Sequence, residues 1–297
     1  MRYKIVFLGT GNFACPSIEL LSIHHNLLAV VSSPNPSFAK RIADELGIKV
    51  YEPDNPNTAE FILELKKLSP DIIALADYGY ILKSELLAIP KLASINLHPS
   101  LLPAYRGAAP IRWAIINGEQ WTGVTTFIMD PEIDHGDILL QERVEILDSD
   151  TYGGLELRLA NIGAELLLDT INRFKELTPS SQPVSLIHAS YAPKISRKLR
   201  EIDWWKPANE IVSLIRALSP EPSAFTIFRG KQLEVLMAVK SDQKGEPGVI
   251  VEVKGKLLVG AGGRCVELLT VKPEAKREQT ALNFINGYRP RVGEIMG

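Results

Sequence analysis

Lys4–Ala14 reads KIVFLGTGNFA, an apolar run of strand length that ends at a glycine-rich turn before a helical segment. A strand, a tight turn and a helix in this order are the opening of a βαβ unit, so the stretch predicts an α/β fold with a mainly parallel sheet. The run lacks the longer apolar region and the small-residue cleavage site of a signal peptide. Export is therefore not expected.

The same alternation of short apolar runs and helix-period segments continues through the first two thirds of the chain. The predicted strands are Lys4–Leu8, Leu27–Val31, Ile72–Leu75, Ser94–Leu97, Val124–Met129 and Ile138–Val144. The predicted helices are Pro16–His24, Phe38–Leu46, Thr58–Leu68, Lys83–Ala88, Pro110–Ile116 and a long one from Asp150-Thr151 to about Leu177. We therefore expect residues 1–180 to form a Rossmann-like domain whose site lies at the carboxyl ends of its strands.

A breaker cluster, Thr178-Pro179-Ser180-Ser181-Gln182-Pro183, predicts the start of an interdomain linker over residues 181–205. Residues 206–297 begin with a predicted helix, Pro207–Ala217, and then change to short apolar runs separated by glycines. The predicted strands there are Ala224–Phe228, Leu233–Ala238, Gly248–Val253, Lys256–Val259 and Val266–Val271. This texture predicts a small C-terminal β-barrel of the OB-like kind.

The bulk composition is that of a globular protein, with 45% apolar and 23% charged residues. No apolar run reaches the roughly 18 residues of a membrane span. The two cysteines, Cys15 and Cys265, lie far apart and suggest neither a disulfide framework nor a zinc site, which fits a reduced cytoplasm. Residues 206–297 hold 14 Lys and Arg against 10 Asp and Glu, whereas residues 1–205 hold 19 against 25. The basic balance of the C-terminal part is compatible with a polyanionic partner, and equally with a chance fluctuation of surface charge.

The turn at Gly9–Ala14 fits the G-x-G-x-x-A pattern of dinucleotide-binding folds. Such folds also need an acidic residue at the end of the second strand to hold the ribose, and here that place holds Ser32-Ser33. We therefore interpret the glycines as a tight turn between strand and helix, with a dehydrogenase-like nucleotide binder as the disfavoured alternative.

Asn96 and His98 lie two residues apart at the end of a predicted strand, so their side chains project from the same face. This is the edge at which open parallel sheets keep their ligands. The loop after His98 is stiffened by Pro99 and Pro103 and can present backbone amides to a ligand. A second loop, Met129–Asp137, carries several acids. If it returns to the same edge, one carboxylate can lie beside His98 and tune its protonation.

These two segments together resemble the folate-dependent formyltransferase family. The pattern N-x-H-x-S-L-L-P-x-Y-R-G-x-x-P covers Asn96–Pro110, and a D-x-G-D motif follows at Asp134–Asp137. The resemblance implies that Asn96, His98 and Asp134 are catalytic, and that Ser100, Leu101, Leu102 and Pro103 contact the folate. It also implies 10-formyltetrahydrofolate as the formyl donor.

The chemistry of formyl transfer suits these three residues. When a neutral amine attacks a formyl carbon, negative charge develops on the oxygen and positive charge on the nitrogen. Asn96 and His98 can donate to the oxygen, and Asp134 can accept the proton, directly or through water. The reaction requires no metal, because the cofactor carries the one-carbon unit.

Further segments resemble the branch of this family that acts on methionyl-tRNA, namely Phe7–Thr10, Tyr191–Ile195, Ile202–Trp204, Ile215–Ala217, and Lys276-Arg277 followed by Phe284–Gly287. The resemblance implies initiator methionyl-tRNA as acceptor, translation initiation as the process, a C-terminal domain that helps to hold tRNA, and a monomer. However, Ser32–Lys40 is short and almost uncharged where that branch carries a basic loop, and His135 replaces the threonine common in D-T-G-D. A nucleotide-linked amino sugar is the alternative acceptor. A purine-pathway enzyme would leave residues 206–297 without a use.

Overall fold

The computed structural model describes residues 2–34, 36–182 and 190–297, which divide into two compact units. The first unit comprises residues 1–110, 121–145 and 156–192, and the second comprises 111–120, 146–155 and 193–297. Residues 183–189 of the expected linker lie outside the described residues. The expected domain boundaries at 180 and 206 stay a prediction. Each unit has its own apolar core, however, and Ile202 and Trp204 from the expected linker are buried in the second one.

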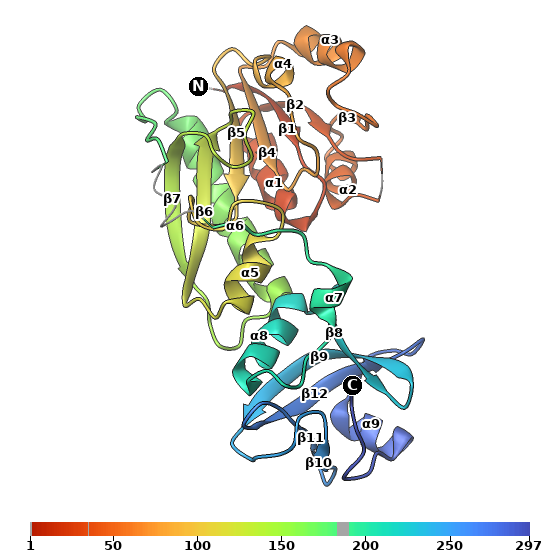
Figure 1. Ribbon diagram of the computed structural model, residues 1–297. Coiled ribbons are helices and arrows are strands. Elements are labelled where there is room, and N and C mark those ends of the chain that lie inside the picture. Colours follow the sequence, from red (N-terminus) through yellow and green to blue (C-terminus); the bar gives the residue numbers. More distant parts are fainter. Residues whose placement is uncertain (1, 35, 183–189) are drawn as a thin grey trace. The chain divides into compact units, whose positions relative to one another are not determined.

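The first unit is built on a seven-stranded sheet in the order β3-β2-β1-β4-β5-β6-β7 (Figure 1). Its strands are β1 Lys4–Leu8, β2 Asn26–Val31, β3 Val50–Tyr51, β4 Ile72–Ala76, β5 Ala93–His98, β6 Trp121–Ile128 and β7 Ile138–Glu145. The first five pair in parallel, whereas β6 pairs with β5 and β7 in the antiparallel sense. The prediction of a mainly parallel sheet is therefore confirmed, with two antiparallel strands at one edge.

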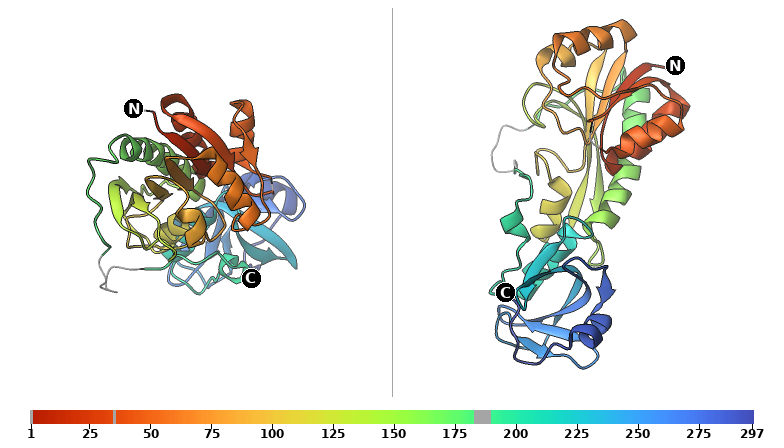
Figure 2. Two further views of the ribbon diagram at one scale, coloured as in Figure 1. Left: turned by 90° about the horizontal axis from the view of Figure 1, so that it is seen from above. Right: turned by 90° about the vertical axis from the view of Figure 1, so that its right-hand side faces the viewer.

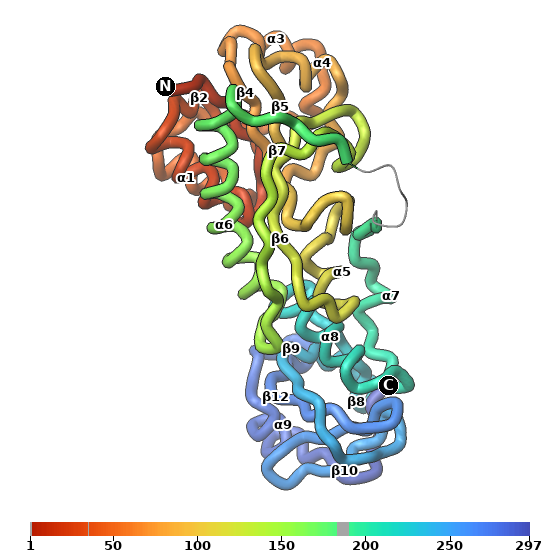
Figure 3. Tube along the Cα trace, turned by 90° about the vertical axis from the view of Figure 1, so that its left-hand side faces the viewer, coloured from red at the N-terminus to blue at the C-terminus, as the bar shows by residue number. Residues whose placement is uncertain are grey.

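The central strands β1 and β4 are continuous apolar runs because helices cover both faces of a parallel sheet. Four of the five residues of β1 and all five of β4 are buried. A short 3-10 turn at Asn12–Ala14 precedes the first helix. The helices that lie wholly or partly in this unit are α1 Cys15–His24, α2 Phe38–Glu45, α3 Ala59–Leu68, α4 Ser84–Leu87, α5 Pro110–Ile116 and α6 Tyr152–Asn172. Helix α6 lies along one face of the sheet (Figure 2), side by side with α1 (Figure 3).

Local signals set the helix ends in this unit. The side chains of Ser37 and Thr58 accept hydrogen bonds from the third residue of α2 and α3 respectively, which satisfies amides that have no partner inside the helix. Helix α3 then ends at Ser69 in the left-handed conformation. Helix α6 ends five residues before the expected Leu177, because the chain turns irregular ahead of the breaker cluster. No helix among the described residues is both long and apolar enough to cross a membrane.

The second unit is a curled antiparallel sheet in the order β10-β11-β12-β9-β8, with β13 paired to β12. Its elements are α7 Arg197–Arg200, α8 Ala208–Leu218, β8 Ala224–Phe228, β9 Lys231–Ser241, β10 Ile250–Glu252, β11 Leu257–Gly260, β12 Cys265–Pro273, β13 Gln279–Thr280 and α9 Ala281–Tyr288. The chain end joins the two edges, because Met296 pairs with Phe228 of β8 and Ile295 pairs with Val249 just before β10. The predicted small barrel is therefore confirmed as a curled antiparallel sheet, a half-barrel, whose two edges are bridged by the last residues of the chain.

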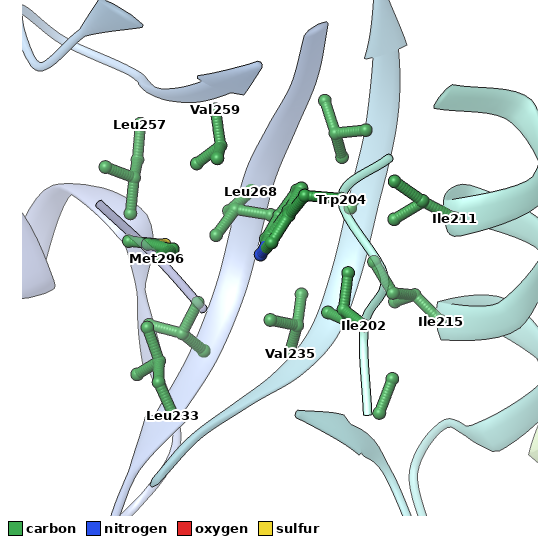
Figure 4. Packing of buried hydrophobic residues seen from close by; sticks show 14 of the residues in the cluster. Ile202, Trp204, Ile211, Ile215, Leu233, Val235, Leu257, Val259, Leu268 and Met296 are labelled. Atoms are coloured by element: carbon green, nitrogen blue, oxygen red, sulfur yellow. The ribbon is translucent and has the colours of Figure 1, made fainter. Parts of the chain in front are cut away.

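The core of this barrel surrounds Trp204, whose ring lies among aliphatic side chains from α8, β9, β11 and β12 (Figure 4). Its indole N–H donates to the hydroxyl of Thr226 at 3.0 Å, so the one polar atom of the ring is satisfied. Helix α9, which the sequence analysis did not predict, adds Phe284 at 1% exposure. The Phe284–Gly287 motif thus serves packing of the second unit.

Candidate active site

Strand β5 carries Asn96 and His98 at the carboxyl edge of the sheet. Asn96 lies opposite Leu75 of β4 and Phe127 of β6, and His98 lies opposite Thr125. His98 is 5% exposed, whereas Asn96 is partly exposed. Within the described part of the chain the Asn96 amide makes no hydrogen bond, so its N–H groups are available to a ligand.

The His98 ring is held between a backbone carbonyl and a carboxylate. Its Nε2 lies 2.9 Å from the carbonyl oxygen of Tyr105, and because that oxygen can only accept, Nε2 carries the proton. Its Nδ1 lies 3.6 Å from Oδ2 of Asp134, which is within the distance of an ion pair but too far for a good hydrogen bond. Two segments 36 positions apart in the sequence therefore meet at this ring, as the sequence analysis required.

Asp134 lies in the loop between β6 and β7 with a backbone φ of 49°, a left-handed conformation that is uncommon for a residue with a side chain. Its Oδ2 accepts a hydrogen bond of 2.8 Å from the amide of Gly107. The side chain is 13% exposed, so the carboxylate is close to solvent without being fully hydrated. The loop is thus shaped to present this carboxylate to His98.

Gln182 is a residue of this site that the sequence analysis did not single out. Its side chain is 7% exposed and contacts both loops. The oxygen accepts from the Arg106 guanidinium, and the nitrogen donates to the carbonyl oxygens of Asp134 and Gly136 at 3.0 and 2.9 Å. No local pattern could have revealed it, because Gln182 lies in the breaker cluster and its partners are 46 to 76 positions away.

The segment Ser100–Pro103 is anchored to the antiparallel strands behind it. The Thr125 hydroxyl donates to the Ser100 carbonyl at 2.6 Å and accepts from the Leu102 amide at 3.2 Å. The Gln141 side chain donates to the Leu102 carbonyl at 2.9 Å. Ser100 and Leu102 are buried, while Leu101 and Pro103 are partly exposed. The segment therefore offers a fixed backbone and partly exposed apolar surface beside His98.

The turn at Gly9–Gly11 has a partner inside the protein. The Gly11 amide donates to the carboxyl group of Asp77, at the end of β4, and the Thr10 amide donates to the Asp77 carbonyl at 3.0 Å. A side chain at Gly11 would collide with the Asp77 carboxyl, and burial raises the pKa of that carboxyl. The amide that would meet a phosphate in a dinucleotide fold thus faces an acidic group, which supports the interpretation of this stretch as a tight turn.

Neither cysteine nor any cluster of ligands adds a second centre. Burial raises the pKa of the Cys15 thiol to about 11, and Cys265 is buried, so neither has the features of a reactive thiol. Across residues 2–34, 36–182 and 190–297, no three His, Cys, Asp or Glu side chains are arranged to hold a metal ion.

Comparison with known proteins identifies the family. Residues 4–171 match the model of the formyl transferase family, and residues 194–289 match the model of the formyl transferase C-terminal domain. The chain belongs to the formyl transferase family. The resemblance drawn from Asn96–Pro110 and Asp134–Asp137 is therefore confirmed, and the protein is a formyltransferase.

Relatives of known activity match this chain over nearly its whole length. A methionyl-tRNA formyltransferase of Caldanaerobacter subterraneus subsp. tengcongensis is 40% identical, with 99% of each chain covered. Two solved structures share the fold at lower identity. HypX from Aquifex aeolicus in complex with tetrahydrofolic acid has a TM-score of 0.71 at 17% identity, with 99% of this chain and 49% of that chain covered. The N-formyltransferase from Helicobacter canadensis in complex with folinic acid and dTDP-3-aminofucose has a TM-score of 0.68 at 23% identity, with 90% and 99% covered.

Proposed function

We propose that this formyltransferase transfers the formyl group of 10-formyltetrahydrofolate to the amino group of initiator methionyl-tRNA, for translation initiation, with Asn96, His98 and Asp134 as its catalytic residues. The observation that carries the catalytic assignment is the 3.6 Å approach of the Asp134 carboxylate to the His98 ring, beside an Asn96 amide without a partner among the described residues. Relatives named methionyl-tRNA formyltransferase at 36 to 40% identity over 99% of this chain support the acceptor.

The three side chains have different roles in the proposed reaction. The amine attacks the formyl carbon, and the Asn96 amide donates to the oxygen as negative charge gathers on it. Because Nε2 of His98 donates to Tyr105, only Nδ1 faces the reacting groups, where a protonated ring stabilises the same oxygen. Asp134 accepts the proton that the amine loses, and the nitrogen of the departing tetrahydrofolate gains one as the old carbon–nitrogen bond breaks.

For the formyl donor, we propose that Ser100, Leu101, Leu102 and Pro103 contact the folate. The anchoring of this segment by Thr125 and Gln141 supports the proposal, because it fixes the backbone without using the partly exposed side chains. A rigid apolar wall with a few aligned polar groups is the usual construction of a cofactor site. The donor itself supplies the one-carbon unit, which it carries in an activated form bound to nitrogen.

For the acceptor, we propose that the second unit helps to hold the tRNA. Its excess of Lys and Arg suits a phosphate backbone, and helix α7 adds three basic residues at Arg197–Arg200. Trp205, at 80% exposure, offers a flat aromatic surface of the kind on which unpaired bases stack. For an enzyme with this acceptor, we expect a monomer that acts in the cytoplasm.

A nucleotide-linked amino sugar is the second candidate acceptor, favoured by one observation. The connection between β2 and α2 is short, and its ends are tied together by a 2.6 Å hydrogen bond between the hydroxyls of Ser32 and Ser37. A tight connection leaves no long basic loop there to hold the end of a tRNA.

One assay separates the two acceptors. Purified protein receives 10-formyltetrahydrofolate with charged initiator tRNA or, separately, with nucleotide-linked amino sugars, and formylated product is measured. We expect transfer to the tRNA, with affinity that falls as salt concentration rises. Transfer to the sugars alone would overturn the proposed acceptor.

A further inference from the structure

We propose that Gln182 is a positioning residue for formyl transfer, which sets the place of the Asp134 carboxylate relative to His98. The proposal rests on the catalytic roles proposed above for these two residues. It goes beyond them because the hydrogen bonds of Gln182 are made to Arg106 and to the backbone of the Asp134 loop.

The Gln182 side chain uses its hydrogen-bonding capacity on both loops at once. Its oxygen faces two N–H groups of Arg106, with Nε at 3.2 Å, and its two N–H groups face the carbonyls of Asp134 and Gly136. Reversing the amide would place N–H against N–H on one side and oxygen against oxygen on the other. The environment therefore requires one acceptor and two donors in the same side chain, which the glutamine amide supplies.

These contacts close a ring that includes the catalytic carboxylate. Gln182 binds Arg106, the next residue Gly107 donates its amide to the Asp134 carboxylate, and the Asp134 carbonyl returns to Gln182. Asp134 is thus held at its backbone and at its side chain by two partners that are themselves linked. A ring of this kind removes the freedom of one loop to slide past the other.

The need for such a hold follows from the conformation of the Asp134 loop. Asp134 has a φ of 49°, and Gly136 packs so closely on the Ile128 carbonyl that a Cβ would lie 1.8 Å from it. Left-handed residues of this kind persist only where the surroundings over-determine them. Other contacts of the loop lie at its exposed side, between His135 and Asp130 at 2.7 Å, and at its base, between Ile128 and Asp137 at 2.9 Å. Among the described residues, the hydrogen bonds to Asp134 itself come from Gln182 and Gly107.

Two substitutions separate the halves of the Gln182 contact. Gln182→Glu keeps an acceptor for Arg106 but cannot donate to the two carbonyls, and Gln182→Met removes both functions at similar volume. If the donated hydrogen bonds position Asp134, both variants lose kcat by on the order of 10- to 100-fold, because a shift of about 1 Å at a reacting group has effects of this size. The KM for the formyl donor stays within roughly threefold, since Ser100–Pro103 is anchored independently.

A double-mutant cycle tests whether the effect runs through Asp134. In a background with Asp134→Asn, adding Gln182→Met should lower kcat by less than about twofold, because the group being positioned no longer accepts a proton. The matched control is Asn161→Asp, the same change from amide to carboxylate at an exposed position of α6 in the first unit, where the Asn161 side chain donates only to the Leu157 carbonyl among the described residues; it should leave kcat unchanged.

Different results would contradict the positioning role of Gln182 and the proposed function of the protein. Wild-type kcat in Gln182→Glu, or full multiplicative loss in the double mutant, overturns the positioning role. A parallel loss of donor binding and of thermal stability in both variants also overturns it, because a merely structural role would move these. Failure of the wild-type protein to formylate either acceptor is instead a failure of the proposed function, and it is seen before any variant is made.

Discussion

The two units of this chain hold their decisive residues in opposite ways. In the first unit, Asn96 is placed by strand pairing within β5, whereas His98 and Asp134 are placed by polar contacts with the loops at the strand ends. In the second unit, Trp204 lies inside a closed sheet and is placed by aliphatic packing, with one hydrogen bond to Thr226. Polar contacts orient the side chains at the proposed catalytic edge, whereas apolar burial stabilises the barrel.

The largest effect expected from this contrast is on turnover. Replacing Asn96, His98 or Asp134 by Ala should each lower kcat by on the order of 100- to 10,000-fold, since each removes a group that acts on developing charge or on a proton. Thermal unfolding should change little by comparison. Near wild-type turnover in any of the three would refute the role assigned to that residue.

A large effect on stability is expected at the barrel core. Trp204→Ala should lower the free energy of unfolding by about 3–5 kcal/mol, because it leaves a cavity and an unpaired Thr226 hydroxyl. The adjacent Trp205→Ala, at a side chain 80% exposed, is the control and should change stability by about 0.5 kcal/mol or less. Denaturant unfolding measures both, and equal losses would contradict the assignment of the core.

A smaller effect is expected where polar anchoring supports the folate segment. Thr125→Val removes the hydroxyl that joins the Ser100 carbonyl to the Leu102 amide and leaves a buried amide unsatisfied, at a cost of about 1–3 kcal/mol. We expect the KM for the formyl donor to rise by on the order of tenfold, with a smaller change in kcat. Thr125→Ser keeps the hydroxyl and should behave as the wild type in steady-state kinetics. An unchanged KM in Thr125→Val would argue that the segment does not contact the donor.

The smallest effect is expected at Asp77, on the turn that the sequence offered as a nucleotide site. Burial raises the pKa of this carboxyl, and the Gly11 amide opposes the shift in part. Because the folded protein binds this proton more tightly than the unfolded chain does, the carboxyl disfavours the fold increasingly as pH rises from the unfolded pKa through the folded one. Part of Asp77 is exposed, so the effect is modest.

Asp77→Asn should therefore raise the midpoint of thermal unfolding slightly at pH 7, and the gain should shrink as the pH falls toward about 4, the ordinary value for Asp. Asparagine also suits the backbone φ of 51° and can still accept from Gly11. Asp54→Asn, at an exposed aspartate away from the Gly9–Gly11 turn, is the control without such a gain. A gain in the unfolding midpoint that grew toward low pH would contradict a raised pKa of the Asp77 carboxyl in the folded protein.

Sequence alone determined the longer strands and helices of the first unit, and the family. The apolar run Lys4–Leu8 is a strand with those bounds, and the pattern Asn96–Pro110 with Asp134–Asp137 led to the formyl transferase family, since both depend on neighbours along the chain. Helix α9 was not predicted from the sequence. The apolar residues around Phe284 form too short a pattern to indicate a helix, and only their packing on the barrel shows that they are buried.

The tertiary structure decided how the pieces meet. The 3.6 Å approach of Asp134 to His98, the contacts of Gln182 with both loops, and the closure of the barrel by Ile295 and Met296 join residues that lie tens of positions apart. Such contacts follow from sheet order and loop path, which no local pattern of residues encodes. Sequence motifs can therefore propose the catalytic side chains, but only the folded chain shows that the buried amide of Gln182 contacts both loops.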